Sequence, residues 1–178
     1  MPDNAAPIKP EIARRPAAAL AKVRANRQSQ TESGRTLMFG RILIAVDLAE
    51  AAPAPKGLAE AVELVTQSGG LLRMVNIQPL LPATFMEYVP ADFDAEQEKR
   101  ASLALQEIVA TVQLPKERVS GCVRVGGIYH EILAEAAEWR ADLIVVGSHR
   151  PVVADYLLGS NAKTIVRHAL CSVLVIRT

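Results

Sequence analysis

Apolar residues along this chain fall into five short runs, and patterns with helical spacing separate the runs. The runs 42–46 and 143–146 contain no polar alternation, which is typical of strands covered on both faces of a parallel sheet. Three further runs also have strand character. The five predicted strands are 41–47, 71–77, 119–125, 143–146 and 172–176.

Each of the first four predicted strands is followed by a helical pattern. Apolar residues three and four positions apart predict helices from residue 58, from Asp94 to Val112, from residue 128 and from residue 160. The pair Gly69-Gly70 ends the first helix, as a left-handed cap would. Strict alternation with right-handed crossovers predicts an α/β fold, a single five-stranded parallel open sheet with helices on both faces.

Two segments lie outside this alternation. Residues 1–37 are rich in Ala, Pro and Arg, which favours a mostly disordered extension. A plainer interpretation is that translation starts at Met38, so that 38–178 is the whole domain. Residues 78–93 form a proline-punctuated loop that is longer than most connections, and such loops are often lids or interaction surfaces.

Charge and cysteine content narrow the function classes. Residues 1–40 carry seven Lys/Arg and three Asp/Glu, whereas residues 41–178 carry thirteen and sixteen. A weakly acidic body without a recognition motif argues against nucleic-acid binding. No run is long enough for a membrane span, and no secretory signal is present. Cys122 and Cys171 are interpreted as two buried thiols in a reducing compartment, and we expect a cytoplasmic protein.

The stretch 142–161 has the order strand, glycine, polar loop, glycine-serine and helix start, which is how a backbone builds a site for an anion. Glycine permits close approach, and the first N–H groups of a helix are unpaired. The candidate phosphate ligands are Gly147, Ser148, Gly159, Ser160 and Asn161. Alternatively, Gly147 is an ordinary turn, and Ser160 or Asn161 is an ordinary N-cap.

Ligands of parallel sheets bind at the carboxyl ends of the strands. Asp47 is the only carboxylate among the residues at those ends. One carboxylate beside a phosphate site suits a ribose hydroxyl or an adenine amino group, because it accepts hydrogen bonds from both. Asp47 could instead cap the following segment.

Known catalytic patterns are missing from the sequence. It contains no Walker-type G-x-x-x-x-G-K-[ST], no G-x-G-x-x-G after the first strand, and no G-x-S-x-G elbow. The three histidines are not at metal-ligand spacing, so no metal site is predicted beyond Mg²⁺ carried by phosphates. Arg150, held extended by Pro151, either aims its guanidinium at phosphates or lies on the surface. We therefore expect this loop to bind its ligand rather than to catalyse rapid turnover.

The segments M-F-G-R-I-L-I-A-V-D, A-D-L-I-V-V-G-S-H-R-P and C-S-V-L-V-I-R give the body a resemblance to the universal stress protein family. The form G-S-H-R-P…Y-L-L-G-S-N-A looks like the branch usually labelled F/G-type. Nucleotide-binding members show G-x2-G-x9-G-[ST]. Gly147 and Gly159-Ser160 match that pattern, whereas Arg150 replaces the second glycine and the spacing to Gly159 is one residue shorter.

The resemblance implies a Rossmann-like fold, similar to that of adenine nucleotide alpha hydrolases, and an ATP site. It places adenine near Val46, Asp47 and Asn76, and ribose near Asp47 and Gly126 or Gly127. It also implies a homodimer paired through the strand Ser172–Ile176. The resemblance implies one of two functions. The first is an ATP-binding stress sensor or regulator, with slow ATP hydrolysis or autophosphorylation at most. The second is a dimeric interaction module that binds no nucleotide, and this alternative is favoured by Arg150 at the position of the second glycine.

Overall fold

The computed structural model describes residues 39–49, 55, 57–80, 90, 92–147 and 159–177. Within these residues, five β-strands alternate with four α-helices, as the sequence predicts, and a 3-10 helix precedes the third strand. The strands are β1 (Arg41–Ala45), β2 (Leu71–Gln78), β3 (Val119–Val125), β4 (Leu143–Gly147) and β5 (Ser172–Ile176). The helices are α2 (Leu58–Ser68), α3 (Phe93–Thr111), α4 (Ile128–Glu138), α5 (Ser160–His168) and the 3-10 helix η2 (Lys116–Arg118).

All five strands run parallel in one sheet, in the order β3-β2-β1-β4-β5. The central strand is β1, where Ile42 pairs with Leu72 of β2 on one side and with Leu143 of β4 on the other. The chain moves outward from β1 to β3 and then returns to β4 beside β1. The strand order therefore reverses between β1 and β4, which is where open α/β sheets bind ligands.

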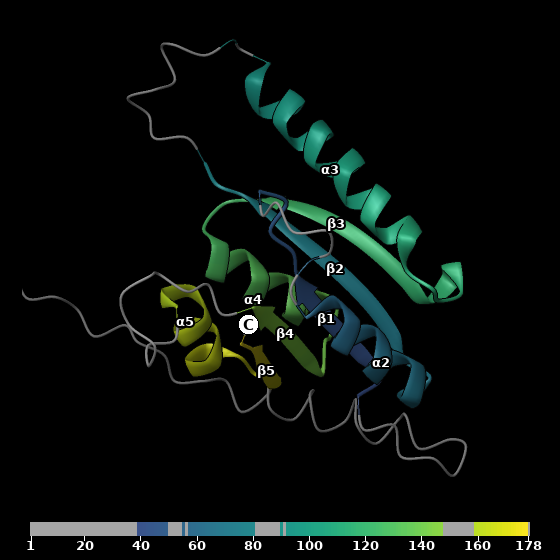
Figure 1. Ribbon diagram of the computed structural model, residues 1–178. Helices are drawn as coiled ribbons and strands as arrows, with labels where there is room; N and C mark the ends of the chain where they lie inside the picture. The colour runs from purple at the N-terminus through teal and green to yellow at the C-terminus, as the bar shows by residue number, and fades with distance from the viewer. Residues whose placement is uncertain are drawn as a thin grey trace, which may run out of the picture.

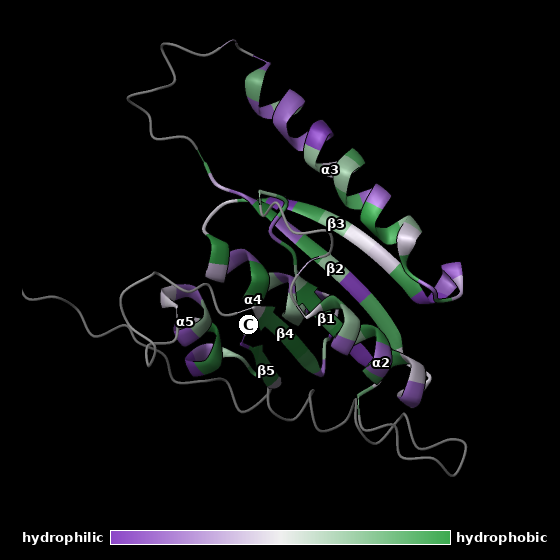
Figure 2. Cartoon of the chain, in the orientation of Figure 1, coloured by the Kyte–Doolittle hydropathy of each residue, from purple (hydrophilic) through white to green (hydrophobic). Residues whose placement is uncertain are grey.

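Helices cover both faces of the sheet (Figure 1). Successive residues of β1 point to opposite faces. Ile42 and Ile44 pack with α2 and α3, whereas Leu43 packs with α4 and α5. All three side chains are fully buried. Figure 2 shows β4 in the hydrophobic colour, whereas hydrophilic positions are interspersed with hydrophobic ones along β2 and α3. Burial on both faces explains why these strands read as unbroken apolar runs.

β1 ends at Ala45, two residues before the predicted strand end at Asp47. The backbone N–H of Val46 still donates to the Val75 carbonyl oxygen at 2.8 Å. The Val46 carbonyl, however, accepts from the side chain of Asn76 at 2.9 Å. A side-chain amide thus takes the place of the next ladder bond, and Asp47 is released from the sheet.

The start and end of α2 both depend on glycine. Gly57 precedes the helix with φ +78°, and a Cβ on it would lie 2.9 Å from the Cγ1 atom of Ile176 in β5. Gly69 ends the helix with φ +74°, and its N–H donates to the Val65 carbonyl. The left-handed cap predicted at Gly69-Gly70 is confirmed.

Candidate functional site

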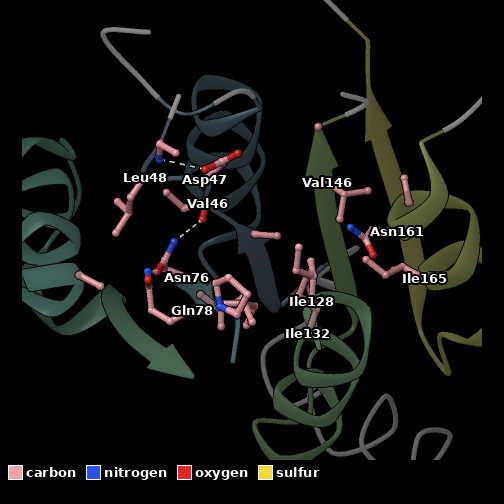
Figure 3. Close-up of a pocket in the computed structure, with 18 of the residues that line it drawn as sticks. Val46, Asp47, Leu48, Asn76, Gln78, Ile128, Ile132, Val146, Asn161 and Ile165 are labelled. Atoms are coloured by element: carbon pink, nitrogen blue, oxygen red, sulfur yellow. Dashed lines mark hydrogen bonds between the residues drawn. The ribbon is translucent and has the colours of Figure 1, made fainter. Parts of the chain in front are cut away.

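A cleft opens at the carboxyl ends of the central strands, at the point where the strand order reverses. Its volume is about 880 Å³, within the range of small-molecule sites. Figure 3 shows Asn76 and Gln78 on one side and Asn161 and Ile165 on the other, with Ile128 and Ile132 between them. The lining combines the ends of β1, β2 and β4 with parts of α3, α4 and α5.

The N-terminus of α5 forms one end of the cleft, with Gly147 of β4 beside it. Gly159 is the N-cap residue, and no side chain within the described part of the chain caps the helix. The first backbone bond of the helix runs from the Lys163 N–H to the Gly159 carbonyl. The N–H groups of Ser160, Asn161 and Ala162 precede that bond, so they lie at the positive end of the helix dipole. Because Gly159 is the cap, neither Ser160 nor Asn161 is the N-cap.

Asn76 forms the opposite end of the cleft and is 4% exposed. Its amide nitrogen donates to the Val46 carbonyl, and its amide oxygen accepts a hydrogen bond from Gln78. Gln78 in turn accepts from Gln97 of α3 at 3.0 Å. This wall offers amide groups and a backbone carbonyl, which can pair with the edge of a planar heterocycle.

Asp47 lies on the same side of the cleft as Asn76 and is exposed (Figure 3). Its Oδ1 accepts a hydrogen bond from the Ala49 N–H at 2.9 Å, so the local capping role considered from the sequence is present. That bond uses one of several acceptor sites on the carboxylate. Asp47 is also the only carboxylate among the described residues that line the cleft.

The floor of the cleft is apolar. It is formed by side chains that are nearly or fully buried: Val46, Val75, Ile132, Val146 and Ile165. An apolar floor between two polar ends suits a ligand that has a flat apolar body and a charged tail.

The structure brings together most of the residues predicted for the site. Those lining the cleft are Val46, Asp47, Asn76, Gly147, Gly159, Ser160 and Asn161. Gly126 and Gly127 do not belong to the lining, although the next residue, Ile128, does. Ser148 and Arg150 lie outside the described residues, as do most of the 78–93 loop and the segment 1–37.

Sequence reasoning missed the contribution of α3, whose residues Gln97, Arg100, Ala101 and Ala104 line the cleft. It also placed Gln78 in a loop, although Gln78 is the last residue of β2. The weak apolar pattern in the first turns of α3 was a signal that this half of the helix packs little against the core.

A second, smaller cleft of about 430 Å³ lies near the start of β1 and the end of α4. Two of its guanidinium groups contact an aromatic ring, although the Nε atoms of Arg41 and Arg73 are buried and have no hydrogen-bond partner among the described residues. The Arg41 and Arg73 guanidinium carbons lie 4.6 and 5.5 Å from the centre of the Trp139 ring. Arg73 also pairs with Glu135 at 3.1 Å. Burial, followed by the charge of Arg73, lowers the pKa of Arg41. We interpret this cluster as structural.

The described residues include neither a candidate metal site nor a candidate membrane-spanning helix. No group of three or more His, Cys, Asp or Glu side chains in that part of the chain is placed to hold a metal ion. None of the helices described there has both the length and the apolar character needed to cross a membrane.

The sheet order and the cleft at its switch point define a Rossmann-like α/β protein with one candidate ligand site. The model of the universal stress protein family matches residues 38–177. This chain belongs to the universal stress protein family.

Individual relatives agree with this assignment. Universal stress protein G of Shigella flexneri is 31% identical over 143 residues, which cover 79% of this chain and all of that protein. Universal stress protein A homolog 1 of Coxiella burnetii is 32% identical over 145 residues, covering 78% of this chain and 96% of the relative.

Solved structures share the fold. Universal stress protein UspA from Lactobacillus plantarum is 25% identical with a TM-score of 0.61, covering 77% of this chain and 97% of that one. A universal stress protein crystallised in complex with cAMP is 18% identical with a TM-score of 0.57, covering 78% of this chain and 97% of that one.

Proposed function

We propose that this chain binds ATP and acts as a nucleotide-dependent stress sensor or regulator in the cytoplasm, rather than as a fast enzyme. One arrangement carries the proposal: the uncapped N-terminus of α5 faces Asp47 and Asn76 across a single cleft at the switch point. The N–H groups of α5 suit phosphates. The carboxylate suits ribose hydroxyls, and the amide wall suits a base.

A related fold supports the adenine-nucleotide class of ligand. A universal stress protein with a similar fold has been crystallised in complex with cAMP, which contains the same base and sugar. Mg²⁺ would arrive with the phosphates, since Asp47 is the only carboxylate in the described lining. The same scarcity of acids, together with the missing Walker lysine, favours binding over rapid turnover.

Isothermal titration with ATP, with and without Mg²⁺, tests the proposal. We expect one site per chain, and we expect Gly159→Val to abolish binding because its side chain fills the phosphate end. Thr164→Val is the control: it places the same side chain on the same helix, at a position outside the described cleft lining. Absence of heat with the wild-type chain would contradict ATP binding and favour the interaction-module alternative.

The β5 edge favours a homodimer as part of the same proposal. β5 forms one edge of the sheet, and each of its five residues is only half-buried. Val166 and Leu170 beside it are 49% and 40% exposed. An apolar edge of this kind is usually covered by a partner. Sedimentation equilibrium should give a dimer for the wild-type chain and a monomer for Val175→Lys; a monomeric wild-type chain would contradict the dimer.

A further inference from the structure

Three side-chain amides form a continuous hydrogen-bonded chain across the cleft wall. The Gln97 amide nitrogen on α3 donates to the Gln78 amide oxygen at 3.0 Å. The Gln78 nitrogen donates to the Asn76 oxygen, and the Asn76 nitrogen donates to the Val46 carbonyl at 2.9 Å. We call these three residues the amide relay. It joins α3 to β2 and to the end of β1.

The relay has a fixed direction. A backbone carbonyl can only accept a hydrogen bond, so the Asn76 amide must point its nitrogen at Val46. The Asn76 oxygen then faces Gln78, which must present its nitrogen and leave its own oxygen for Gln97. The Val46 carbonyl, which directly follows β1, thus determines the orientation of the Gln97 amide on α3. A carboxylate cannot replace Gln97, because an ionised carboxylate has no proton to donate.

The relay holds a part of α3 that has little other support. The helix spans nineteen residues, but its buried residues are Ala101 and Leu105. None of the residues in its first two turns, 93–100, is buried. Within the described residues, the Gln97–Gln78 bond is the only side-chain hydrogen bond that links α3 to another element. The same helix supplies part of the cleft wall through Gln97, Arg100, Ala101 and Ala104.

We propose that Gln97 is a positioning residue: acting through the amide relay, it holds the first turns of α3 against the base end of the cleft and thereby sets the affinity for the base. This inference rests on the proposed function. Gln97 is remote from the phosphate end, which is built by Gly147 and α5 at the other side of the lining. Loss of the relay should therefore weaken binding of the base and leave binding of the phosphates unchanged.

Two glutamines on α3 provide a matched test. Gln106 is exposed on the same helix and has no relay partner among the described residues, so Gln97→Ala and Gln106→Ala change helix propensity equally. The ligands are ATP and inorganic triphosphate, which lacks the base. We expect Gln97→Ala to weaken ATP binding about five- to tenfold, the range for a lost hydrogen bond of about 1 kcal/mol. Triphosphate affinity should not change, and Gln106→Ala should match the wild type with both ligands.

Hydrogen exchange of the ligand-free chain tests the structural step separately. Gln97→Ala and Gln97→Glu should both speed exchange of the backbone amides 97–100, and Gln106→Ala and Gln106→Glu should not. If amides 97–100 of Gln97→Glu exchanged at the wild-type rate, the proposed direction of the relay would be wrong. Only a relay with the opposite direction could accept a carboxylate at position 97.

The remaining outcomes separate the two proposals. If the wild-type chain binds ATP and Gln97→Ala binds it equally well, the positioning role is wrong and the proposed function stands. Equal losses of ATP and triphosphate affinity would also overturn it, because that pattern indicates general damage to the cleft. If the wild-type chain binds neither ligand, the proposed function fails and the base-positioning role fails with it, whatever the exchange data show for α3.

Discussion

The buried carboxylate of Asp142 accepts a 2.8 Å hydrogen bond from the backbone N–H of Gly40, 102 residues earlier in the chain. Its other oxygen accepts from the Arg41 N–H at 3.1 Å. Asp142 directly precedes β4, and Gly40 directly precedes β1. One side chain therefore aligns the starts of the two strands whose opposite ends form the cleft.

Asp142→Asn should destabilise the fold, because its amide nitrogen would face a backbone N–H that also donates. We expect a loss of about 1–3 kcal/mol, the cost of leaving a buried donor unpaired. Urea denaturation measures it, with the exposed Asp94→Asn on α3 as the control. Equal denaturation midpoints for the two variants would show that the pair contributes nothing to stability.

Asp47 should recognise the ribose hydroxyls if ATP occupies the cleft. The wild-type chain should bind ATP about tenfold or more tightly than 2′,3′-dideoxy-ATP, as expected for a charge-assisted hydrogen bond. Asp47→Ala should bind the two nucleotides equally. Titration calorimetry on all four combinations isolates the contact. A variant that still prefers ATP would assign the ribose contact to another residue.

Arg124 holds three carboxylates of α4 together. It lies 2.8 Å from Glu131 and 2.9 Å from both Glu135 and Glu138. Arg124→Met leaves these charges facing one another, so we expect a loss of about 2 kcal/mol at pH 7, between the values for exposed and buried pairs. Arg100→Met is the control, because its nearest carboxylate is 3.9 Å away and both partners are exposed.

The effect of Arg124→Met should fade in acid. Hydrogen bonding to Arg124 lowers the pKa of Glu131 from its ordinary value of 4.5. A lowered pKa in the folded state means that this stabilisation is present above pH 4.5 and is lost as the pH falls through the lowered value. Denaturation midpoints of the two chains should therefore converge as the pH falls through the lowered pKa of Glu131. A constant difference between them would show that packing, not charge, is responsible.

Both cysteines should react slowly in the folded protein. Burial raises the pKa of the Cys122 and Cys171 thiols from 9.0 to about 11, which lowers the thiolate fraction at pH 8 by roughly a hundredfold. Alkylation by iodoacetamide should be slow at pH 8 and rise steadily up to pH 11. Urea-unfolded chain, reacting at the ordinary rate, is the control.

The same shift has a consequence for stability. The pKa of each thiol is higher in the folded chain than in the unfolded chain. The stabilisation that this difference provides is therefore fully present below pH 9 and is lost as the pH rises toward 11. Replacing both cysteines by alanine should remove this loss. An unchanged alkaline profile in the double variant would mean that other groups cause it.

Arg140 offers a stabilising substitution. It ends α4 with φ 58°, the only positive φ found for a residue other than glycine in the described ranges. The Ala141 N–H closes the helix on the Ala136 carbonyl. Arg140→Gly should raise stability by about 1 kcal/mol, because the left-handed conformation costs a side chain that much. Arg140→Ala removes the charge but keeps the Cβ, so it should gain less; an equal gain would assign the effect to charge.

The sequence predicted the strands and helices well because burial on both faces leaves unbroken apolar runs. It could not predict which strands are neighbours. Leu72 and Leu143 both belong to apolar strand patterns, and nothing in those patterns indicates that they pair with Ile42 from opposite sides. That limit bears on Gly126 and Gly127. They follow the edge strand β3 and stay outside the cleft lining, whereas α4, which begins at the next residue, reaches the cleft through Ile128.

Contacts between distant side chains were also beyond the sequence. Gln97 and Gln78 are nineteen residues apart and meet only because α3 returns over β2. Asn76 was predicted at the site through the family resemblance. Its bond to Val46, which shortens β1, depends on a side-chain rotamer that no periodic pattern records.

The strand order has a consequence for assembly. β3 and β5 are the two outer strands, and they run in the same direction. Contact of β5 with β5 of a second copy is related by a twofold axis, so it closes at two chains. Contact of β5 with β3 of the next copy would instead continue the parallel sheet without limit and produce a filament. The difference between a closed pair and an open polymer therefore depends on whether the exposed edge of β3 can accept a second strand.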